Sequence, residues 1–302
     1  MMSKNERHVF IGVLLVLMAA LAVMLLRNVL GSGQTEIRRV SVLLDGEGES
    51  YWQNFRLGVD KAAREHNVDV RYVFRYDGPA GTAQAEQLRR EWEGELDGVI
   101  LVPVDGEALA EALQEAPAGL AVTVVGPDLP NVDGTCTISA SPEEMGRRLA
   151  DAVADSGVSS CAVILTGQEG ENALRRYRGL EERFQERGVA WRTVMASTVE
   201  MLPEPNGQPV VALEPGTTEA LCTWGGPVYG FGTSNSILSS LEEGTAAALV
   251  VQSDYDAGYL SLLSVLEALD GAQPEDQTLD CYTVTAENMF TDPMDQILFP
   301  VA

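Results

Sequence analysis

The sequence predicts an α/β fold of two similar lobes, each a doubly wound parallel sheet covered by helices, preceded by one transmembrane helix. Apolar runs of strand length recur between residues 40 and 284, and amphipathic stretches of helix length separate them. The alternation runs through two units of about a hundred residues each, a common size for one α/β lobe. A single uncharged apolar run precedes both units.

The apolar run covers residues 9–26, where Gly12 is the one residue that is not apolar. A run of this length, at about 1.5 Å per residue, spans roughly 27 Å, close to the hydrocarbon thickness of a bilayer. Lys4 and Arg7 precede it and favour an N-terminus on the cytoplasmic side. The sequence therefore predicts a cytoplasmic tail over residues 1–8, a transmembrane anchor over 9–30 and a linker over 31–37.

Two other interpretations of this run remain open. A secretory signal peptide has a shorter apolar region of about 7 to 15 residues, and Ala20-Leu21-Ala22 offers a cleavage motif. A buried core helix is the third interpretation. With an uncleaved anchor, the rest of the chain lies outside the cytoplasm and the protein crosses the cell membrane once.

The first α/β unit begins after the linker. Its expected strands are 40–44, 68–74, 98–102, 120–125 and 136–139, and its expected helices are 51–66, 81–93 and 107–114. In the first helix Phe55, Val59 and Ala62 share one face. The strand 98–102 is a continuous apolar run, which is typical of a parallel sheet with helices on both faces.

The second unit opens at Ser141, where Ser141 and Glu144 form a capping box around Pro142 in the first turn of a helix. Its expected strands are 161–165, 190–196, 210–213, 228–231, 247–251 and 281–284, and its helices include 172–186 and 257–269. Open α/β sheets bind ligands beyond the carboxyl ends of their strands. If the two lobes face each other, their strand ends border one shared cleft, and we expect the ligand to bind there.

Composition excludes several classes of function. The net charge is −25, and a surface this acidic repels nucleic acid and anionic lipid. His8 and His66 are the only histidines, which excludes a multi-histidine metal site. No histidine is placed for a serine triad, no pair among the 45 carboxylates is distinctive, and no phosphate-binding glycine motif follows a strand, so we predict no enzyme, no metal and no cofactor. The four cysteines form no CxxC pair, and free thiols and disulfides stay equally open: Cys136, Cys161, Cys222 and Cys281.

Five motifs, in order, carry a resemblance to a known family. They are Tyr51-Trp52 with Gly58, LDGVILVPVD over residues 96–105, RYRGL over 176–180, VYGFG over 228–232, and GTAAALVVQ over 244–252 followed by Gly258-Tyr259. Over residues 38–300 the chain resembles the type I periplasmic sugar-binding proteins, both the ribose-binding class and the effector domains of lactose-repressor-like regulators.

The resemblance implies two lobes that are joined by three crossovers near residues 140, 252 and 282 and that close on a ligand. The N-terminal lobe would hold residues 38–140 and 253–282, and the C-terminal lobe residues 141–252 and 283–302. Lactose-type repressors carry a DNA-reading motif before this module. Here a membrane-length apolar segment stands in that place, which decides against a repressor.

A sugar-like ligand needs aromatic faces for its C–H groups, and carboxylates, amides or arginine for its hydroxyls. The resemblance and the positions after strand ends give these candidates: Tyr51, Trp52, Asp77, Asp105, Asp128, Arg176, Glu214 and Gln252. Plainer roles stay open: a helix-start contact for Tyr51 or Trp52, a turn for Asp77, a helix cap for Asp105, and a solvated charge for Asp128, Arg176 or Glu214.

Four positions depart from the family pattern. Gly126 stands where the resemblance expects an acidic residue, Glu214 where it expects asparagine, and Gly232 where it expects aspartate. Ser141-Pro142 replaces an Asp-Asn pair at the first crossover. The ligand is therefore not a common free hexose or pentose, or the cleft has lost tight sugar binding.

The leading hypothesis is a membrane-anchored solute-binding protein that hands a small polar, sugar-like ligand to an ABC-type transporter permease. The alternative is a ligand sensor that reports occupancy to a membrane partner such as a sensor kinase. A third, weaker interpretation is a degenerate binding fold that serves as a protein-interaction surface.

Overall fold

A computed structural model gives the structure of the chain. It describes residues 37–44, 52–74, 80–94, 96–103, 106–126, 129, 132, 134–167, 169–202 and 207–301, together with Met18 and Leu21. The chain divides into two compact units, Met1–Arg38 and Arg39–Ala302. All the helices and strands discussed below belong to the second unit.

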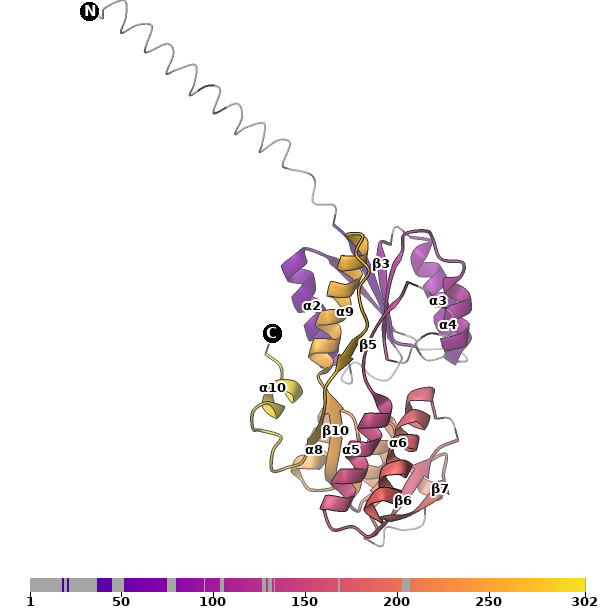
Figure 1. Cartoon of the computed structure of the whole chain (residues 1–302), viewed down its shortest axis with the longest axis vertical. Helices are drawn as coiled ribbons and strands as arrows, with labels where there is room; N and C mark the ends of the chain where they lie inside the picture. Colours follow the sequence, from indigo (N-terminus) through magenta and orange to yellow (C-terminus); the bar gives the residue numbers. More distant parts are fainter. Residues whose placement is uncertain are drawn as a thin grey trace, which may run out of the picture. The chain divides into compact units, whose positions relative to one another are not determined.

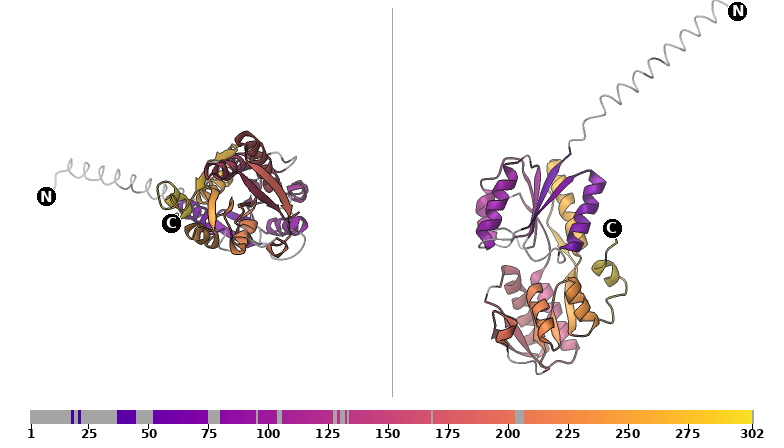
Figure 2. Two further views of the ribbon diagram at one scale, coloured as in Figure 1. Left: turned by 90° about the horizontal axis from the view of Figure 1, so that it is seen from below. Right: turned by 180° about the vertical axis from the view of Figure 1, so that it is seen from behind.

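The first lobe is built on a six-stranded sheet in the order β11-β5-β4-β3-β1-β2, in which all neighbours run parallel. Its elements are β1 (Arg39–Leu44), α2 (Gln53–His66), β2 (Asp69–Phe74), α3 (Ala80–Trp92), β3 (Gly98–Leu101), α4 (Gly106–Leu113), β4 (Ala121–Val125), β5 (Cys136–Ala140), α9 (Asp254–Leu269) and β11 (Gln277–Leu279). The pair α2 and α9 covers one face of the sheet, and the pair α3 and α4 covers the other (Figures 1 and 2). Every residue of β3 is buried because helices cover both faces.

The second lobe repeats this plan on a sheet in the order β12-β10-β9-β8-β6-β7. Its elements are α5 (Pro142–Asp155), β6 (Ser160–Leu165), α6 (Glu171–Arg187), β7 (Ala190–Met195), η1 (Val199–Met201), β8 (Val210–Val211), α7 (Pro215–Trp224), β9 (Val228–Phe231), α8 (Asn235–Glu242), β10 (Ala246–Gln252), β12 (Cys281–Val284) and α10 (Met294–Leu298). The helices α5 and α6 pack on one face of the sheet, and α7 and α8 on the other. As the sequence predicted, Ser141 caps α5: its hydroxyl accepts a hydrogen bond from the backbone N–H of Glu144 at 3.3 Å.

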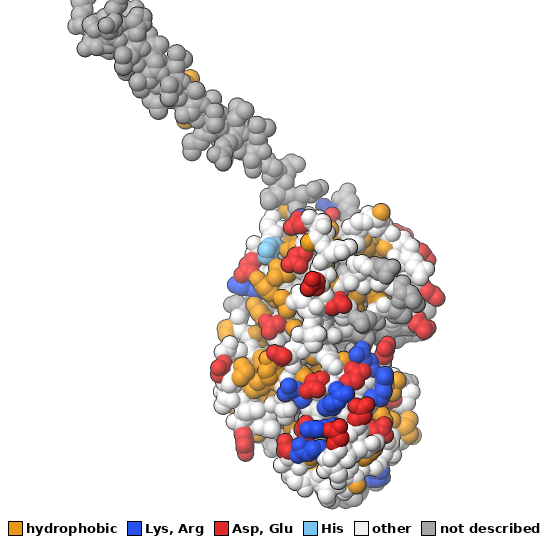
Figure 3. Space-filling view, in the orientation of Figure 1, with side chains coloured by type: hydrophobic (Ala, Val, Ile, Leu, Met, Phe, Trp, Pro, Cys, Tyr) orange, Lys and Arg blue, Asp and Glu red, His pale blue; other side chains and the backbone are white. Residues whose placement is uncertain are grey.

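Ion pairs connect the exposed sides of α5 and α6. Arg175 binds Glu143 with N···O distances of 2.8 and 3.0 Å, and Arg183 and Arg187 share the carboxylate of Asp151. Figure 3 shows these arginines and acidic residues as interleaved blue and red side chains over the two helices. Most of these groups are partly exposed, so each pair adds little to stability.

The chain passes between the two sheets at three places. It leaves β5 for α5 at Ser141, leaves β10 for α9 at Ser253, and leaves β11 for β12 at Asp280. The last passage explains a departure from the all-parallel sheets that the sequence predicted. Because Asp280 alone separates β11 from β12, the chain enters the second sheet without a helical return, and β12 runs antiparallel to β10.

In each lobe two helices cross with a glycine from each helix at the contact. A β-carbon on Gly58 of α2 would lie 2.0 Å from the carbonyl oxygen of Tyr255, and one on Gly258 of α9 would lie 2.1 Å from that of Phe55. The second lobe has the same arrangement. There Gly146 of α5 and Gly179 of α6 would each place a β-carbon 2.0 Å from a carbonyl oxygen of the facing helix. These glycines let the helix backbones touch.

The structure also bears on the cysteines, on the bounds of several elements and on the N-terminal apolar run. All four cysteines are free thiols, which closes the disulfide alternative. The short strand β11 and the short helix α10 were missed, and α9 begins three residues earlier than expected because Ser253 caps it. Among the described residues, no helix is long and apolar enough to cross a membrane. The predicted anchor over residues 9–30 lies outside the described residues, apart from Met18 and Leu21.

Candidate ligand-binding cleft

The candidate residues divide into two groups. Tyr51, Asp77, Asp105 and Asp128 lie outside the described residues. Trp52, Arg176, Glu214 and Gln252 are described. Arg176, Glu214 and Gln252 belong to or adjoin elements of the second lobe. Their contacts, described next, connect them to the ends of its strands.

Trp52 occupies the position just before α2 and makes no capping hydrogen bond with its side chain. Its ring meets that of Phe55 edge to face, with the ring centroids 5.8 Å apart and the planes at 76°. Phe55 is fully buried in the first lobe, whereas Trp52 is partly exposed. The contact fixes the start of α2 and leaves part of the indole surface accessible.

Arg176 lies on α6, and its guanidinium reaches across the ends of two strands. Its Nη1 donates a hydrogen bond to the carbonyl of Leu213, two residues after β8, at 2.9 Å. Its guanidinium carbon lies 4.4 Å from the ring centroid of Phe231, the last residue of β9. A guanidinium held by a carbonyl and an aromatic face is fixed in position, so it can contact a ligand at the strand ends without a large entropic cost.

Glu214 follows Leu213 and precedes α7. A residue at this position usually caps the helix, but the Glu214 side chain makes no capping hydrogen bond. Its Oε1 instead accepts one from the backbone N–H of Gly170 at 3.1 Å, just before α6. Burial raises the pKa of the Glu214 carboxyl, although the Gly170 N–H and the charge of Arg176 act in the opposite direction.

Glu169 adds to this effect, because its negative charge also raises the pKa of Glu214. Burial alone would raise the pKa of Glu169 itself. Hydrogen bonds from backbone N–H groups and from Thr166 outweigh burial, so the pKa of Glu169 is lowered and it stays ionised.

Gln252 lies at the end of β10 and is joined to another passage between the sheets. Its Oε1 accepts a hydrogen bond from the backbone N–H of Ala140 at 3.1 Å, and its Nε2 donates to Asp254 at 3.3 Å. Asp254 also accepts from the Thr233 hydroxyl at 3.0 Å. Burial raises the pKa of Asp254, despite these hydrogen bonds and the charge of Arg176. One N–H of the Gln252 amide remains available to a ligand.

Asn172, on the first turn of α6, was not predicted from the sequence as a site residue. Its Oδ1 is buried and has no hydrogen-bond partner in the described part of the chain. A β-carbon on Gly126, directly after β4 of the first lobe, would lie 3.6 Å from its Nδ2. Asn172 therefore lies where the lobes meet. Its spacing of four residues before Arg176 puts both side chains on one helix face, which is the signal that could have identified it.

The departures from the family pattern have structural reasons at two glycines. Gly232 has φ +112°, and a β-carbon there would lie 2.7 Å from Cδ1 of Ile237 and 3.0 Å from Cβ of Pro215. Gly126 has φ +118°, a conformation that L side chains rarely adopt. Neither position can take an aspartate without a change of backbone. Glu214 is thus the one charged side chain among the four altered positions.

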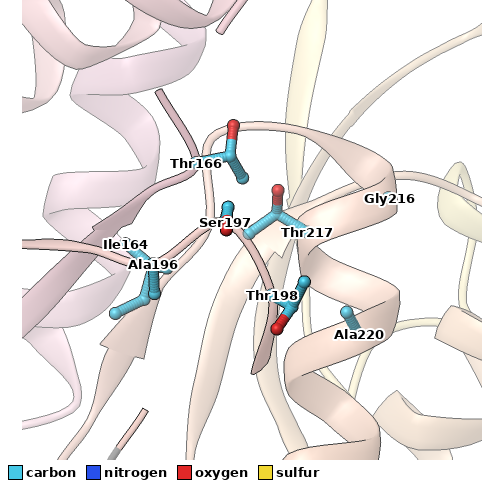
Figure 4. A pocket seen from close by; sticks show the side chains of 8 residues that line it. All are labelled: Ile164, Thr166, Ala196, Ser197, Thr198, Gly216, Thr217 and Ala220. Atoms are coloured by element: carbon cyan, nitrogen blue, oxygen red, sulfur yellow. The ribbon is translucent and has the colours of Figure 1, made fainter. Parts of the chain in front are cut away.

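A separate cavity of about 200 Å³ lies beside this group, between the ends of β6 and β7 and the start of α7 (Figure 4). Its lining combines four hydroxyl side chains with a small apolar floor: Ile164, Thr166, Ala196, Ser197, Thr198, Gly216, Thr217 and Ala220. None of the predicted ligand-binding residues lines it. Among the described residues, no group of histidine, cysteine and acidic side chains can hold a metal ion.

Comparison with known proteins fits this geometry. The periplasmic binding protein domain matches residues 40–273. The chain belongs to that family. The family and the solute-binding proteins among its structural neighbours are not enzymes. No curated protein sequence matches the chain.

Solved structures share the fold at low sequence identity. A carbohydrate-transporter solute-binding protein from Agrobacterium radiobacter, in complex with D-arabinose, has a TM-score of 0.76 at 17% identity and covers 87% of this chain and 99% of its own. A glucose–galactose-binding protein from Geobacillus stearothermophilus has 0.71 at 18%, covering 84% and 99%. A LacI-type transcriptional regulator from Bacteroides fragilis has 0.68 at 13%, covering 84% and 99%.

Proposed function

We propose that this protein captures a small polar, sugar-like ligand between its two lobes, outside the cytoplasm, and delivers it to an ABC-type transporter. The observation that carries the proposal is the placement of Arg176. Its guanidinium is fixed over the ends of β8 and β9, next to Glu214 and Asn172, where open α/β sheets bind their ligands. Membership of the periplasmic binding family supports the same role.

Both lobes contribute to the proposed site. Tyr51 and Trp52 form an apolar wall for the face of a sugar ring, and Asp77, Asp105 and Asp128 accept hydrogen bonds from its hydroxyls. From the second lobe Arg176, Glu214 and Gln252 complete the polar contacts. The proposed lobes comprise residues 38–140 with 253–282 and residues 141–252 with 283–302, and they close about the three passages between the sheets. Because Cys281 and Tyr282 pair with β10, the third passage lies at Asp280, two residues before the proposed boundary.

The direct test measures thermal unfolding of the detergent-solubilised full chain, followed by tryptophan fluorescence, against a panel of pentoses, hexoses and polyols. A ligand that binds the folded state alone, at about 100 times its Kd, stabilises that state by about 2.7 kcal/mol. We expect at least one compound to raise the melting temperature in a concentration-dependent way. A panel in which no sugar or polyol does so would contradict the proposed ligand class.

The anchor is a separate part of the proposal. Residues 9–26 hold the protein in the membrane with the acidic lobes outside, because this uncharged run follows Lys4 and Arg7. We expect the full chain to stay in carbonate-washed membranes and its lobes to be cut by protease added outside intact cells. Full-length protein in the soluble fraction would exclude the anchor, and a chain shortened near residue 22 would show a cleaved signal peptide.

The sensor hypothesis makes a different prediction about partners. Cross-linking in intact cells should join the ligand-loaded chain to a permease if it serves a transporter. Cross-linking to a histidine kinase in its place would favour the sensor.

A further inference from the structure

The second-lobe side of the cleft contains more hydrogen-bond acceptors than its own donors satisfy. Glu214 receives one hydrogen bond, from Gly170, through one of its two oxygens. The buried Oδ1 of Asn172 has no partner in the described part of the chain. A buried acceptor without a donor costs free energy, so the Asn172 Oδ1 calls for a ligand that supplies N–H or O–H groups. The partly exposed carboxylate of Glu214 can accept hydrogen bonds from the same ligand.

Negative charge also exceeds positive charge around Glu214. Glu169 and Glu214 contribute two carboxylates, whereas Arg176 is the described cation that acts on Glu214. The adjacent Arg175 is engaged with Glu143 on the helix surface. No lysine or arginine within the described ranges forms an ion pair with Glu214. A partly buried carboxylate in this situation is stabilised by a cation that arrives with a ligand.

Capping of α7 does not explain the side chain of Glu214. As a helix cap it would accept hydrogen bonds from the first turn of α7, and it makes none. The family pattern, by resemblance, has a neutral asparagine at this position. Glutamate keeps an acceptor oxygen there and adds a negative charge, which changes the kind of ligand that the position favours.

We propose that the ligand carries a cationic amino group, as an amino sugar does, and that the carboxylate of Glu214 and the Oδ1 of Asn172 receive it. This inference rests on the proposed function and specifies its ligand class. An ammonium group offers three N–H donors and a positive charge, so it satisfies both acceptors and compensates the carboxylate. A neutral hydroxyl at the same place satisfies one acceptor and leaves the charge uncompensated.

The test compares matched pairs of sugars on the full chain in detergent: D-glucosamine with D-glucose, and D-galactosamine with D-galactose, with the N-acetylated amino sugars as neutral controls. Dissociation constants come from calorimetry. We expect one amino sugar to bind about 10-fold or more tightly than its neutral partner and its N-acetyl form, because a charge-assisted contact is stronger than a neutral one.

Variants then assign the preference to Glu214. Glu214→Gln keeps the acceptor for Gly170 and removes the charge, so we expect it to fold and to bind the amino sugar and its neutral partner equally. Glu219→Gln, an exposed change on α7, should leave the preference intact. Melting temperatures of the unliganded variants check folding, and Asn172→Ala should weaken amino-sugar binding independently.

The outcomes separate the two proposals. Neutral sugars that bind as tightly as the amino sugars, or more tightly, would overturn the amine inference and leave the proposed function standing. A preference that survives Glu214→Gln would also overturn it. Failure of all six compounds, together with the wider sugar panel, would overturn the sugar-like ligand itself and the inference with it.

Discussion

The side-chain oxygen of Gln252 accepts a hydrogen bond from the backbone N–H of Ala140 at 3.1 Å, although 112 residues separate them in the chain. Ala140 ends β5 just before the first passage between the sheets, and Gln252 ends β10 just before the second. The same amide donates to the partly buried Asp254. One side chain therefore joins two passages, and a relative movement of the lobes would act on this contact.

Gln252→Leu should destabilise the protein, because it removes the side-chain acceptor of the Ala140 N–H and one of the donors to the Asp254 carboxyl. Buried polar groups that lose a partner cost about 1 to 3 kcal/mol. Urea unfolding of the unliganded chain measures the loss in free energy of unfolding. Gln185→Leu, on an exposed face of α6, is the matched control and should change little. Equal stability of the two variants would show that the amide has no role at the crossovers.

The paired glycines give a second prediction. Gly58→Ala would bring a methyl group 2.0 Å from the carbonyl of Tyr255, so α2 and α9 must separate. Gly179→Ala should act in the same way on α5 and α6. Each change should cost about 3 kcal/mol, the upper end of the usual range for overpacking. Thermal unfolding measures it, with Arg64→Ala on the exposed face of α2 as control. A melting temperature within error of the unchanged protein would refute the close packing.

These glycines also show how far the sequence could predict the structure. Gly58, Gly179 and Gly258 all belong to the motifs that carried the family resemblance, and the structure explains them by helix packing and not by ligand contact. Strands and helices were predictable because burial on both faces produces unbroken apolar runs, as in β3. The antiparallel β12 was not predictable, since its direction depends on a passage between lobes and not on local pattern.

The site was predictable to a lesser degree. The motif identified Arg176, but its contacts with Leu213 and Phe231 depend on strand ends that lie far from it in the chain. Glu214 appeared as a departure from the family pattern, and only the structure shows that its side chain turns towards Gly170 and away from the helix that it precedes. Asn172 was missed because an asparagine on a first helical turn normally indicates only a cap.

Glu214 should make the unliganded protein less stable as pH rises. In the folded protein its pKa lies above the ordinary value of 4.5, chiefly because of burial. Below pH 4.5 the Glu214 carboxyl is protonated in both the folded and the unfolded chain, so it does not lower the free energy of unfolding. As pH rises through 4.5 the unfolded chain ionises first, so the folded state loses stability until its own carboxyl ionises.

Glu214→Gln removes this cost. The variant and the unchanged chain should have equal melting temperatures near about pH 4, and the variant should melt higher near about pH 7.5. The control is Glu219→Gln, which makes the same change of side chain at an exposed position on α7. A variant that is less stable than the unchanged chain at the higher pH would mean that the folded protein stabilises the Glu214 carboxylate.

Trp52→Ala tests the apolar wall of the proposed cleft. Removal of an aromatic surface that covers a sugar face should cost on the order of 1 to 3 kcal/mol of binding free energy. That range corresponds to a rise in Kd of roughly 5- to 150-fold, measured by calorimetry with the best ligand from the sugar panel. Trp92→Ala is the control, since Trp92 packs on the opposite face of the first sheet. An unchanged Kd for Trp52→Ala would place the ligand elsewhere.

Arg176→Lys separates charge from geometry at the second lobe. Lysine keeps the positive charge but lacks the planar group that lies over the Phe231 ring and donates to the Leu213 carbonyl. If the guanidinium positions the end of β8, the variant should lose stability by about 1 kcal/mol and bind the ligand about 10-fold more weakly. Arg178→Lys, exposed on the same helix, should retain both properties. Full binding by Arg176→Lys would show that a positive charge alone suffices there, and the fixed guanidinium would then have no part in recognition.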